Sequence, residues 1–311
     1  MILGIVVPCY NEEEVLTETA SRLSTFLTGM IAEGLVDGAS KIWFVDDGSK
    51  DRTWSLIEQL SASGPRVAGI KLSRNRGHQN ALLAGLFTAE GDALISIDAD
   101  LQDDIQVMKS MLLDHQRGVD VVYGVRKKRD SDTWFKRVTA EGFYKFIGVM
   151  GVESVFNHAD YRLMSRRALE ALKEFREVNL FLRGIVPLIG FKSAIVYYDR
   201  VERFAGESKY PLSKMLGLAL DAITSFSSVP LRMITFIGFT VFAATLAITG
   251  WTLWIRFFSD TAVPGWASTV LPMYLLGGIQ IFCIGVIGEY LGKIYREVKS
   301  RPRYIIERIV E

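Results

Sequence analysis

Short apolar runs alternate with segments of helical spacing through the first 126 residues, and this alternation limits the possible folds more than any other feature. Five apolar runs have the length of a β-strand, at residues 3–7, 42–45, 67–72, 94–97 and 119–123. Helix-like segments follow the first four, at about residues 13–31, 51–60, 79–89 and 105–116. Strands that alternate with helices predict a mostly parallel, doubly wound sheet with right-handed crossovers. We therefore predict an α/β, Rossmann-like fold.

Polar residues gather directly after the predicted strands. In a doubly wound sheet, ligands bind outside the carboxyl ends of the strands, so these residues mark a predicted ligand site. The sequence lacks both GxxxxGK followed by Ser or Thr and a GxGxxG after its first strand, which argues against a P-loop NTPase and a dinucleotide-dependent oxidoreductase. The polar clusters are residues 10–12, Asp46 with Asp47, residues 74–78, Asp98 with Asp100, and Arg126.

The fourth predicted strand ends in a short acidic stretch. Side chains two apart in an extended segment point the same way, so Asp98 and Asp100 would place two carboxylates side by side. Repulsion between like charges raises the pKa of a carboxylate unless a cation is present. A hard divalent ion, Mg²⁺ or Mn²⁺, would relieve this repulsion and also hold a phosphate. The alternative interpretation is an acidic loop before a helix. With either interpretation, we expect Asp103 and Asp104 at the helix N-terminus.

Charge and cysteine content argue against several other classes. The formal net charge is +1, which gives no electrostatic reason to expect a nucleic acid partner. The two cysteines, Cys9 and Cys283, have no CxxC spacing, and the three histidines form no HExxH pattern. Neither a thiolate zinc site nor a disulfide framework is therefore predicted. The N-terminus shows no signal-peptide pattern.

Two long runs without charged residues predict a membrane hairpin. Residues 233–255 and 261–288 contain no Asp, Glu, Lys or Arg, and as helices they would reach roughly 35 and 42 Å, against a hydrocarbon core of about 30 Å. We therefore expect transmembrane helices at about residues 233–255 and 264–288. Positive residues flank both ends, which predicts a two-span protein of the inner (plasma) membrane, with its catalytic domain and both termini cytoplasmic. Glycines in the second run would permit a homo-oligomer.

These patterns divide the chain into three predicted regions. Residues 1–210 would form the cytoplasmic α/β catalytic domain. Residues 211–229 carry a helical apolar stripe next to a predicted transmembrane run, which indicates an interfacial amphipathic helix. Residues 230–311 would hold the two transmembrane helices and a basic cytoplasmic C-terminal tail.

Several of these motifs together resemble one enzyme family. The first loop, the second strand end and the acidic stretch are similar to the nucleotide-sugar-binding elements of the inverting, GT-A fold glycosyltransferases of family 2. Further motifs resemble the polyisoprenyl-phosphate glycosyltransferases, which include dolichol-phosphate mannose synthase and the bacterial bactoprenol glucosyltransferase type. The resemblance covers nearly the whole chain, and the residues that carry it are 8–12, 45–49, 75–79, 98–103, 160–163 and 203–210.

The resemblance implies a role for each matching residue. The nucleoside would be held by Pro8, Tyr10, Asn11, Glu12 and Asp46. Asp98 would lie near the ribose, the diphosphate and a Mg²⁺ or Mn²⁺ ion, with Asp100 and Gln102 as further metal ligands. Asp160 would be the catalytic base near the acceptor, or would only orient the acceptor, and Arg162 is either functional or an ion-pair partner of Asp160. The phosphates would be met by Arg126, Arg203, Ser208 and Lys209.

The implied reaction is the inverting transfer of one sugar from a nucleotide sugar to a polyisoprenyl phosphate such as undecaprenyl phosphate, at the cytoplasmic membrane face. UDP-glucose is the expected donor, while N-acetylglucosamine, aminoarabinose derivatives and mannose remain open. A processive polysaccharide synthase on the same fold is a rival, but the sequence lacks its Gln-x-x-Arg-Trp motif. A non-enzymatic membrane protein is a second rival, and the intact set of Asp98, Asp100 and Asp160 argues against it.

Overall fold

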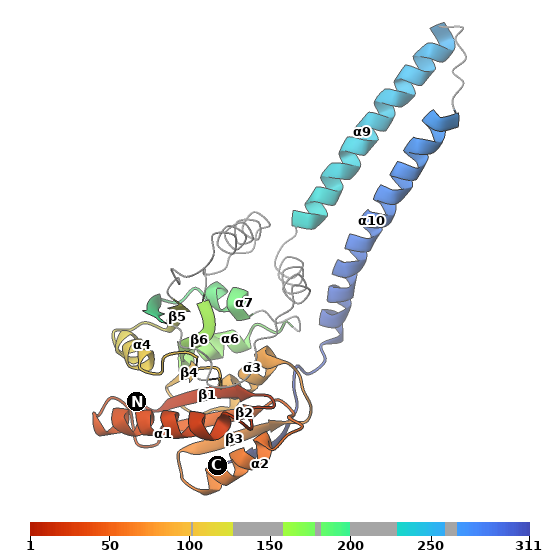
Figure 1. The fold of residues 1–311 in the computed structure, drawn as a ribbon. Helices are drawn as coiled ribbons and strands as arrows, with labels where there is room; N and C mark the ends of the chain where they lie inside the picture. Colours follow the sequence, from red (N-terminus) through yellow and green to blue (C-terminus); the bar gives the residue numbers. More distant parts are fainter. Residues whose placement is uncertain (101, 127–157, 178–181, 200–228, 259–265) are drawn as a thin grey trace. The chain divides into compact units, whose positions relative to one another are not determined.

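The computed structural model describes the chain apart from Leu101 and residues 127–157, 178–181, 200–228 and 259–265 (Figure 1). The chain divides into two compact units. One consists of Met1–Ala140, Glu153–Tyr210 and Ser300–Glu311, and the other of Glu141–Val152 and Pro211–Lys299.

The first unit is built around one sheet of eight strands, in the order β7-β5-β6-β4-β1-β2-β3-β8. The central strands β4, β1, β2 and β3 run parallel to one another. Strand β6 runs antiparallel to both of its neighbours, β4 and β5, while β7 is parallel to β5. The strands are β1 (Leu3–Cys9), β2 (Lys41–Asp46), β3 (Val67–Leu72), β4 (Ala93–Ser96), β5 (Val121–Arg126), β6 (His158–Ser165), β7 (Ser193–Tyr198) and β8 (Ile306–Val310).

Helices cover both faces of this sheet. Alternate residues of β1 point to opposite faces: Ile5 and Val7 join the apolar core beneath α1 and α4, whereas Val6 points toward α3. Helix α3 approaches so closely that a Cβ atom built at Gly85 would lie 2.3 Å from Val6 Cγ1. The helices are α1 (Leu16–Ala32), α2 (Thr53–Ala62), α3 (His78–Thr88), α4 (Val107–Gln116), α6 (Arg166–Lys173) and α7 (Leu182–Leu188).

The five strands predicted from the apolar runs are all present, and the four central ones form the expected parallel arrangement. All seven residues of β1 are buried, as expected for a strand covered on both faces. Strand β6 was not predicted. Its direction matters for the site, because an antiparallel strand brings its first residues to the edge where the parallel strands end.

Strand β8 was also not predicted, since its residues were assigned to a basic tail. It pairs antiparallel with β3 and so covers an edge that would otherwise expose unpaired backbone groups. Side chains of β8 and of the residue after it form ion pairs with the sheet or with α2: Lys41–Glu311 (2.7 Å), Lys71–Glu307 (2.9 Å) and Arg308–Glu58 (2.7 Å). The last residues of the chain therefore belong to the same unit as the first.

The second unit contains two long helices that contact each other, α9 (Val229–Phe258) and α10 (Trp266–Lys299). Over the described positions, neither these nor any other helix combines the length and the apolarity that a membrane crossing requires. The predicted transmembrane hairpin is therefore wrong, and so is the localisation as a two-span inner-membrane protein that depended on it. A run without charges isn't necessarily apolar enough to cross, and charge was the criterion used. Residues 211–228 of the predicted interfacial helix lie outside the described residues.

Candidate active site

The ends of β1 and β2 place the first predicted site residues together. Cys9 is in register with Asp46, and the Asp47 N–H donates to the Cys9 carbonyl (2.9 Å). Pro8 is the last but one residue of β1, and Tyr10, at the start of the next loop, is 41% exposed. The predicted nucleoside-binding residues therefore lie in one region.

Side-chain bonds between the two loops fix the backbone of residues 10–12. The Asn11 N–H donates to Ser49 Oγ (3.0 Å), and Asn11 Oδ1 accepts from the Lys50 N–H (2.9 Å). The Glu12 N–H donates to Thr53 Oγ1 (2.9 Å). Asn11 has a φ of 54°, a left-handed conformation that asparagine tolerates better than most residues. These bonds tie the loop after β1 to the loop after β2 and to the start of α2.

Asp46 carries an unusual buried oxygen. Its Oδ1 accepts from the Ser49 N–H (3.1 Å), whereas its Oδ2 is buried and has no hydrogen-bond partner among the described residues. Burial raises the pKa of Asp46, against the lowering effect of its bonds with Ser49. An unsatisfied buried acceptor costs about 1–3 kcal/mol, so a bound N–H donor at this position would be favoured.

Asp47 has a structural role that the sequence didn't reveal. Its two carboxylate oxygens accept the backbone N–H groups of Arg76 (2.7 Å) and Gly77 (2.8 Å). Gly77 has a φ of 87° and precedes α3 directly. Asp47 therefore fixes the loop after β3 and, through it, the position of His78.

The acidic stretch after β4 lies beside these loops, because β4 pairs with β1 and the Ile97 N–H donates to the Val6 carbonyl (3.1 Å). Burial raises the pKa of Asp98; His78 lowers it, and Asp103, Asp160 and Asp100 raise it further. Asp100 Oδ1 accepts the backbone N–H of Gln102 (3.2 Å). Negative charge is thus concentrated where the sequence predicts a cation.

The described residues fit the predicted metal site if substrate phosphates supply part of the ligands. Within the part of the chain that the structure describes, no three His, Cys, Asp or Glu side chains are grouped closely enough to hold a metal ion. Mg²⁺ usually binds through one or two carboxylates together with substrate phosphates, so it needs no such group. Asp98 and Asp100 suit a site of that kind, and Gln102 lies in the same turn.

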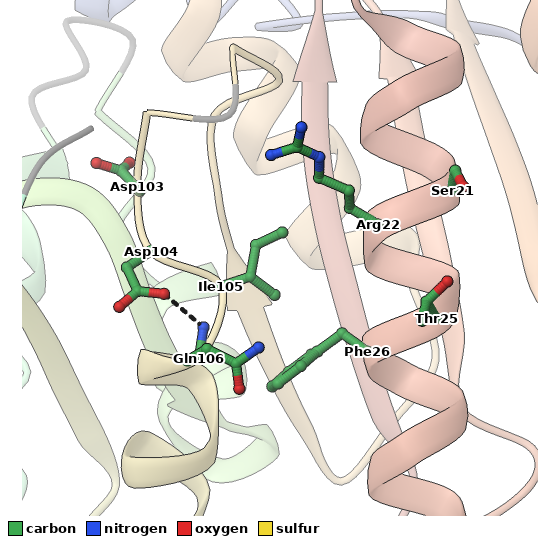
Figure 2. A pocket seen from close by; sticks show the side chains of 8 residues that line it. All are labelled: Ser21, Arg22, Thr25, Phe26, Asp103, Asp104, Ile105 and Gln106. Carbon is green, nitrogen blue, oxygen red and sulfur yellow. Dashed lines mark hydrogen bonds between the residues drawn. The ribbon is translucent and has the colours of Figure 1, made fainter. Parts of the chain in front are cut away.

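Asp103 and Asp104 differ in burial and in hydrogen-bond partners, although the sequence predicted both at the helix N-terminus. Asp104 does act there, since its Oδ1 accepts the Gln106 N–H (2.9 Å) at the start of α4 (Figure 2). Asp103 instead is buried, and its Oδ1 accepts from Tyr198 Oη (2.5 Å) and Arg126 Nη2 (3.3 Å). The expectation for Asp103 was wrong, because its partners come from β5 and β7, far away in sequence.

Arg126, predicted to meet phosphate, is therefore held between Asp103 and Tyr198, to whose Oη its Nε donates (3.2 Å). Burial lowers the pKa of Arg126, but Asp103, Tyr198 and Asp98 together outweigh burial, and the net shift is upward. Arg203, Ser208 and Lys209 lie outside the described residues.

A hollow of about 430 Å³ lies between α1 and this acidic loop. Figure 2 shows its lining, with Arg22 and Phe26 of α1 facing Asp103, Asp104 and Ile105. Neither Asp98 nor Asp100 lines it. The hollow is therefore distinct from the predicted metal position.

Asp160 reaches the site through the antiparallel direction of β6, in which Arg162 is in register with Ser96 at the end of β4. Its Oδ1 accepts from Arg162 Nη2 (2.6 Å) and its Oδ2 from Arg183 Nη2 (3.4 Å). His78 Nε2 lies 3.5 Å from Asp98 Oδ1 and 3.8 Å from Asp160 Oδ2. His78 thus connects the acidic end of β4 with the start of β6.

These neighbours control the ionisation of Asp160. Burial alone would raise its pKa, but Arg162, Arg183 and His78 outweigh burial and lower the pKa to about 2. The carboxylate is therefore ionised at neutral pH and is a weak base. Arg162 is buried and paired, which confirms its ion-pair role without excluding another.

The low pKa of Asp160 predicts a pH-dependent stability. Because the folded pKa of about 2 lies below the ordinary value of 3.8, the ionised carboxylate stabilises the fold above about pH 4 and this contribution is lost as the pH falls through 2. We expect urea titrations between about pH 4 and 2 to show a loss of about 2 kcal/mol in wild type that is absent from Asp160→Asn. An equal decrease in both proteins would contradict this assignment.

The sequence placed Asp47 and His78 among the polar clusters that follow the strands but predicted no individual role for either, or for Arg183. His78 stood in a motif of the resemblance, which was a usable signal. Arg183 had no such signal, because only the tertiary structure places the start of α7 beside Asp160.

The chain is similar to known proteins over most of its length. The sequence profile described as "Glycosyl transferase family 2" matches residues 4–173. The "Uncharacterized glycosyltransferase YkoT" of Bacillus subtilis is 53% identical over 308 residues, 98% of this chain and 91% of that protein. The "Prophage bactoprenol glucosyl transferase homolog" of Escherichia coli is 42% identical over 310 residues, 99% of each chain.

Similarity to solved structures is weaker. A glucosyl-3-phosphoglycerate synthase from Mycobacterium tuberculosis, solved with phosphoglyceric acid, overlaps 72% of this chain and 78% of its own, at 19% identity and a TM-score of 0.46. That level of similarity adds nothing to the argument about the site.

Proposed function

The chain belongs to glycosyl transferase family 2 and is a glycosyltransferase, and from this premise we propose that it transfers one sugar, with inversion, from UDP-glucose to a polyprenyl phosphate such as undecaprenyl phosphate. The observation that carries the proposal is the meeting of Asp98 and Asp160 around His78, at 3.5 and 3.8 Å. This proximity supports a donor site at Asp98 that adjoins an acceptor site at Asp160. The name of the E. coli relative, which mentions bactoprenol and glucosyl transfer, supports the lipid and the sugar.

The donor nucleoside would bind at the ends of β1 and β2. Within the described part of the chain, the buried Oδ2 of Asp46 has no hydrogen-bond partner, which suits an N–H of a nucleobase such as uracil. Tyr10 is exposed next to the ordered loop at Asn11 and Glu12, so its ring is accessible to a base.

The donor diphosphate would lie near the acidic end of β4. Asp98 and Asp100, with Gln102, would hold Mg²⁺ or Mn²⁺, which when bound neutralises charge on the leaving diphosphate. Arg126 lies beside Asp103, and with Arg203, Ser208 and Lys209 it forms the proposed set of phosphate-binding residues.

The acceptor phosphate would approach from the side of Asp160. One of its oxygens forms a bond to the anomeric carbon while the bond from that carbon to the diphosphate oxygen breaks, which releases UDP and inverts the configuration. A phosphate monoester has a second pKa of about 6 and needs little help to lose its proton near neutral pH. With a pKa of about 2, Asp160 is suited to orienting the acceptor and not to removing a proton.

The test is a transfer assay on the full chain. The purified protein is incubated with radiolabelled UDP-glucose, undecaprenyl phosphate in detergent, and Mg²⁺ or Mn²⁺. We expect a lipid that carries a single sugar, and we expect excess EDTA to lower its formation at least about tenfold, with recovery when Mg²⁺ is restored.

Matched reactions with UDP-N-acetylglucosamine, a UDP-aminoarabinose derivative and GDP-mannose identify the donor. A higher rate with one of these would correct the sugar and leave the reaction class intact. A long polymer, or no transfer from any of the four donors, would contradict the proposed function.

A further inference from the structure

More positive charge surrounds Asp160 than one carboxylate needs. Arg162 already compensates it, at 2.6 Å and with a side chain only 2% exposed. Arg183 makes a longer contact with the other oxygen, at 3.4 Å, and its side chain is 44% exposed. An arginine carries five N–H donors, so a guanidinium that gives one to Asp160 can still bind an incoming anion.

The position of Arg183 is fixed by its surroundings. The preceding residue, Leu182, donates its N–H to Gln79 Oε1 (3.0 Å), and its carbonyl accepts from Arg162 Nη1 (3.5 Å). Gln79 follows His78 in α3, which Asp47 positions through the Gly77 N–H. The start of α7 is thus attached to the elements that build the site.

From this arrangement we infer that Arg183 binds the phosphate monoester of the acceptor, in a subsite beside Asp160 and His78; this rests on the proposed function. The planar guanidinium can donate two parallel N–H groups to phosphate, which a lysine can't reproduce. Asp160, already paired with Arg162, holds Arg183 in place and is a positioning residue. The donor's diphosphate is proposed to lie near Asp98, whereas Arg183 contacts Asp160, so we assign Arg183 to the acceptor.

Kinetics of Arg183→Gln and Arg183→Lys test the assignment, with a water-soluble short-chain prenyl monophosphate and UDP-glucose varied separately. We expect Arg183→Gln to raise the KM for the prenyl phosphate about ten- to a hundredfold and to change the KM for UDP-glucose less than twofold. The KM of Arg183→Lys for the prenyl phosphate should lie between those of wild type and Arg183→Gln. The control is Arg167→Gln. Arg167 forms an ion pair with the buried Asp120, at the other end of β6 from Asp160. This variant should leave both KM values unchanged.

Calorimetric titration without the sugar donor separates this inference from the proposed reaction. Wild type should bind the prenyl monophosphate at least tenfold more tightly than Arg183→Gln, while binding of UDP with Mg²⁺ and the weak binding of inorganic phosphate serve as comparisons. If wild type binds the prenyl phosphate through Arg183 but transfers no sugar, the proposed function fails and the subsite stands. If Arg183→Gln weakens UDP as much as the prenyl phosphate, or lowers kcat without moving either KM, the subsite assignment is overturned.

Discussion

Asp100→Asn is expected to lower glycosyl transfer at least about a hundredfold at ordinary Mg²⁺ concentrations. Asp98 and Asp100 are the two carboxylates proposed to hold the cation, and loss of one removes half of the charge that attracts it. Burial and neighbouring carboxylates already raise the pKa of Asp98, so the charge of this stretch favours a bound cation. Part of the activity should return when the concentration of Mg²⁺ or Mn²⁺ is raised, because the variant weakens binding of the ion.

The matched control is Asp104→Asn, in the same acidic stretch. Asp104 accepts the Gln106 N–H at the start of α4, and asparagine can accept the same bond. Its rate should remain within about twofold of wild type. Full activity of Asp100→Asn at ordinary Mg²⁺ would exclude a metal-binding role for Asp100.

Arg162→Met is expected to destabilise the first unit by about 3–5 kcal/mol. Arg162 is buried and bonded to Asp160 at 2.6 Å, so its removal leaves a carboxylate that is only 10% exposed with less compensation of its charge. Urea unfolding followed by circular dichroism measures the change. The double variant Arg162→Met/Asp160→Leu should regain much of the loss, because it buries no unpaired charge.

Arg22→Gln is a control that separates the effect of burial from the effect of losing an ion pair. Arg22 and Glu18 also form an ion pair at 2.6 Å, but their side chains are 49% and 41% exposed. We expect Arg22→Gln to cost less than about 0.5 kcal/mol, since exposed pairs contribute little. A similar loss in both variants would mean that the buried pair has no special role in stability.

Features that depend on residues close together in the sequence were the easiest to predict. The apolar runs identified strands β1 to β5, and the polar residues after them identified the edge where Asp46 and Asp98 lie. Asp103 shows where this approach failed: it was assigned to a helix end because of its neighbours, but it is paired with Arg126 and Tyr198. The hairpin prediction failed because it counted charges, where a crossing depends on apolarity.

The sequence by itself determined the alternation of strands and helices, the carboxylates after β4 and the resemblance to family 2, because periodicity and motifs are local properties of a chain. Only the tertiary structure decided that β6 runs antiparallel, which puts Asp160 beside His78 and Asp98, and that β8 closes the edge at β3. It alone showed that Arg183 contacts Asp160. Strand direction and ion pairing depend on contacts between residues far apart in the chain, so no local pattern specifies them.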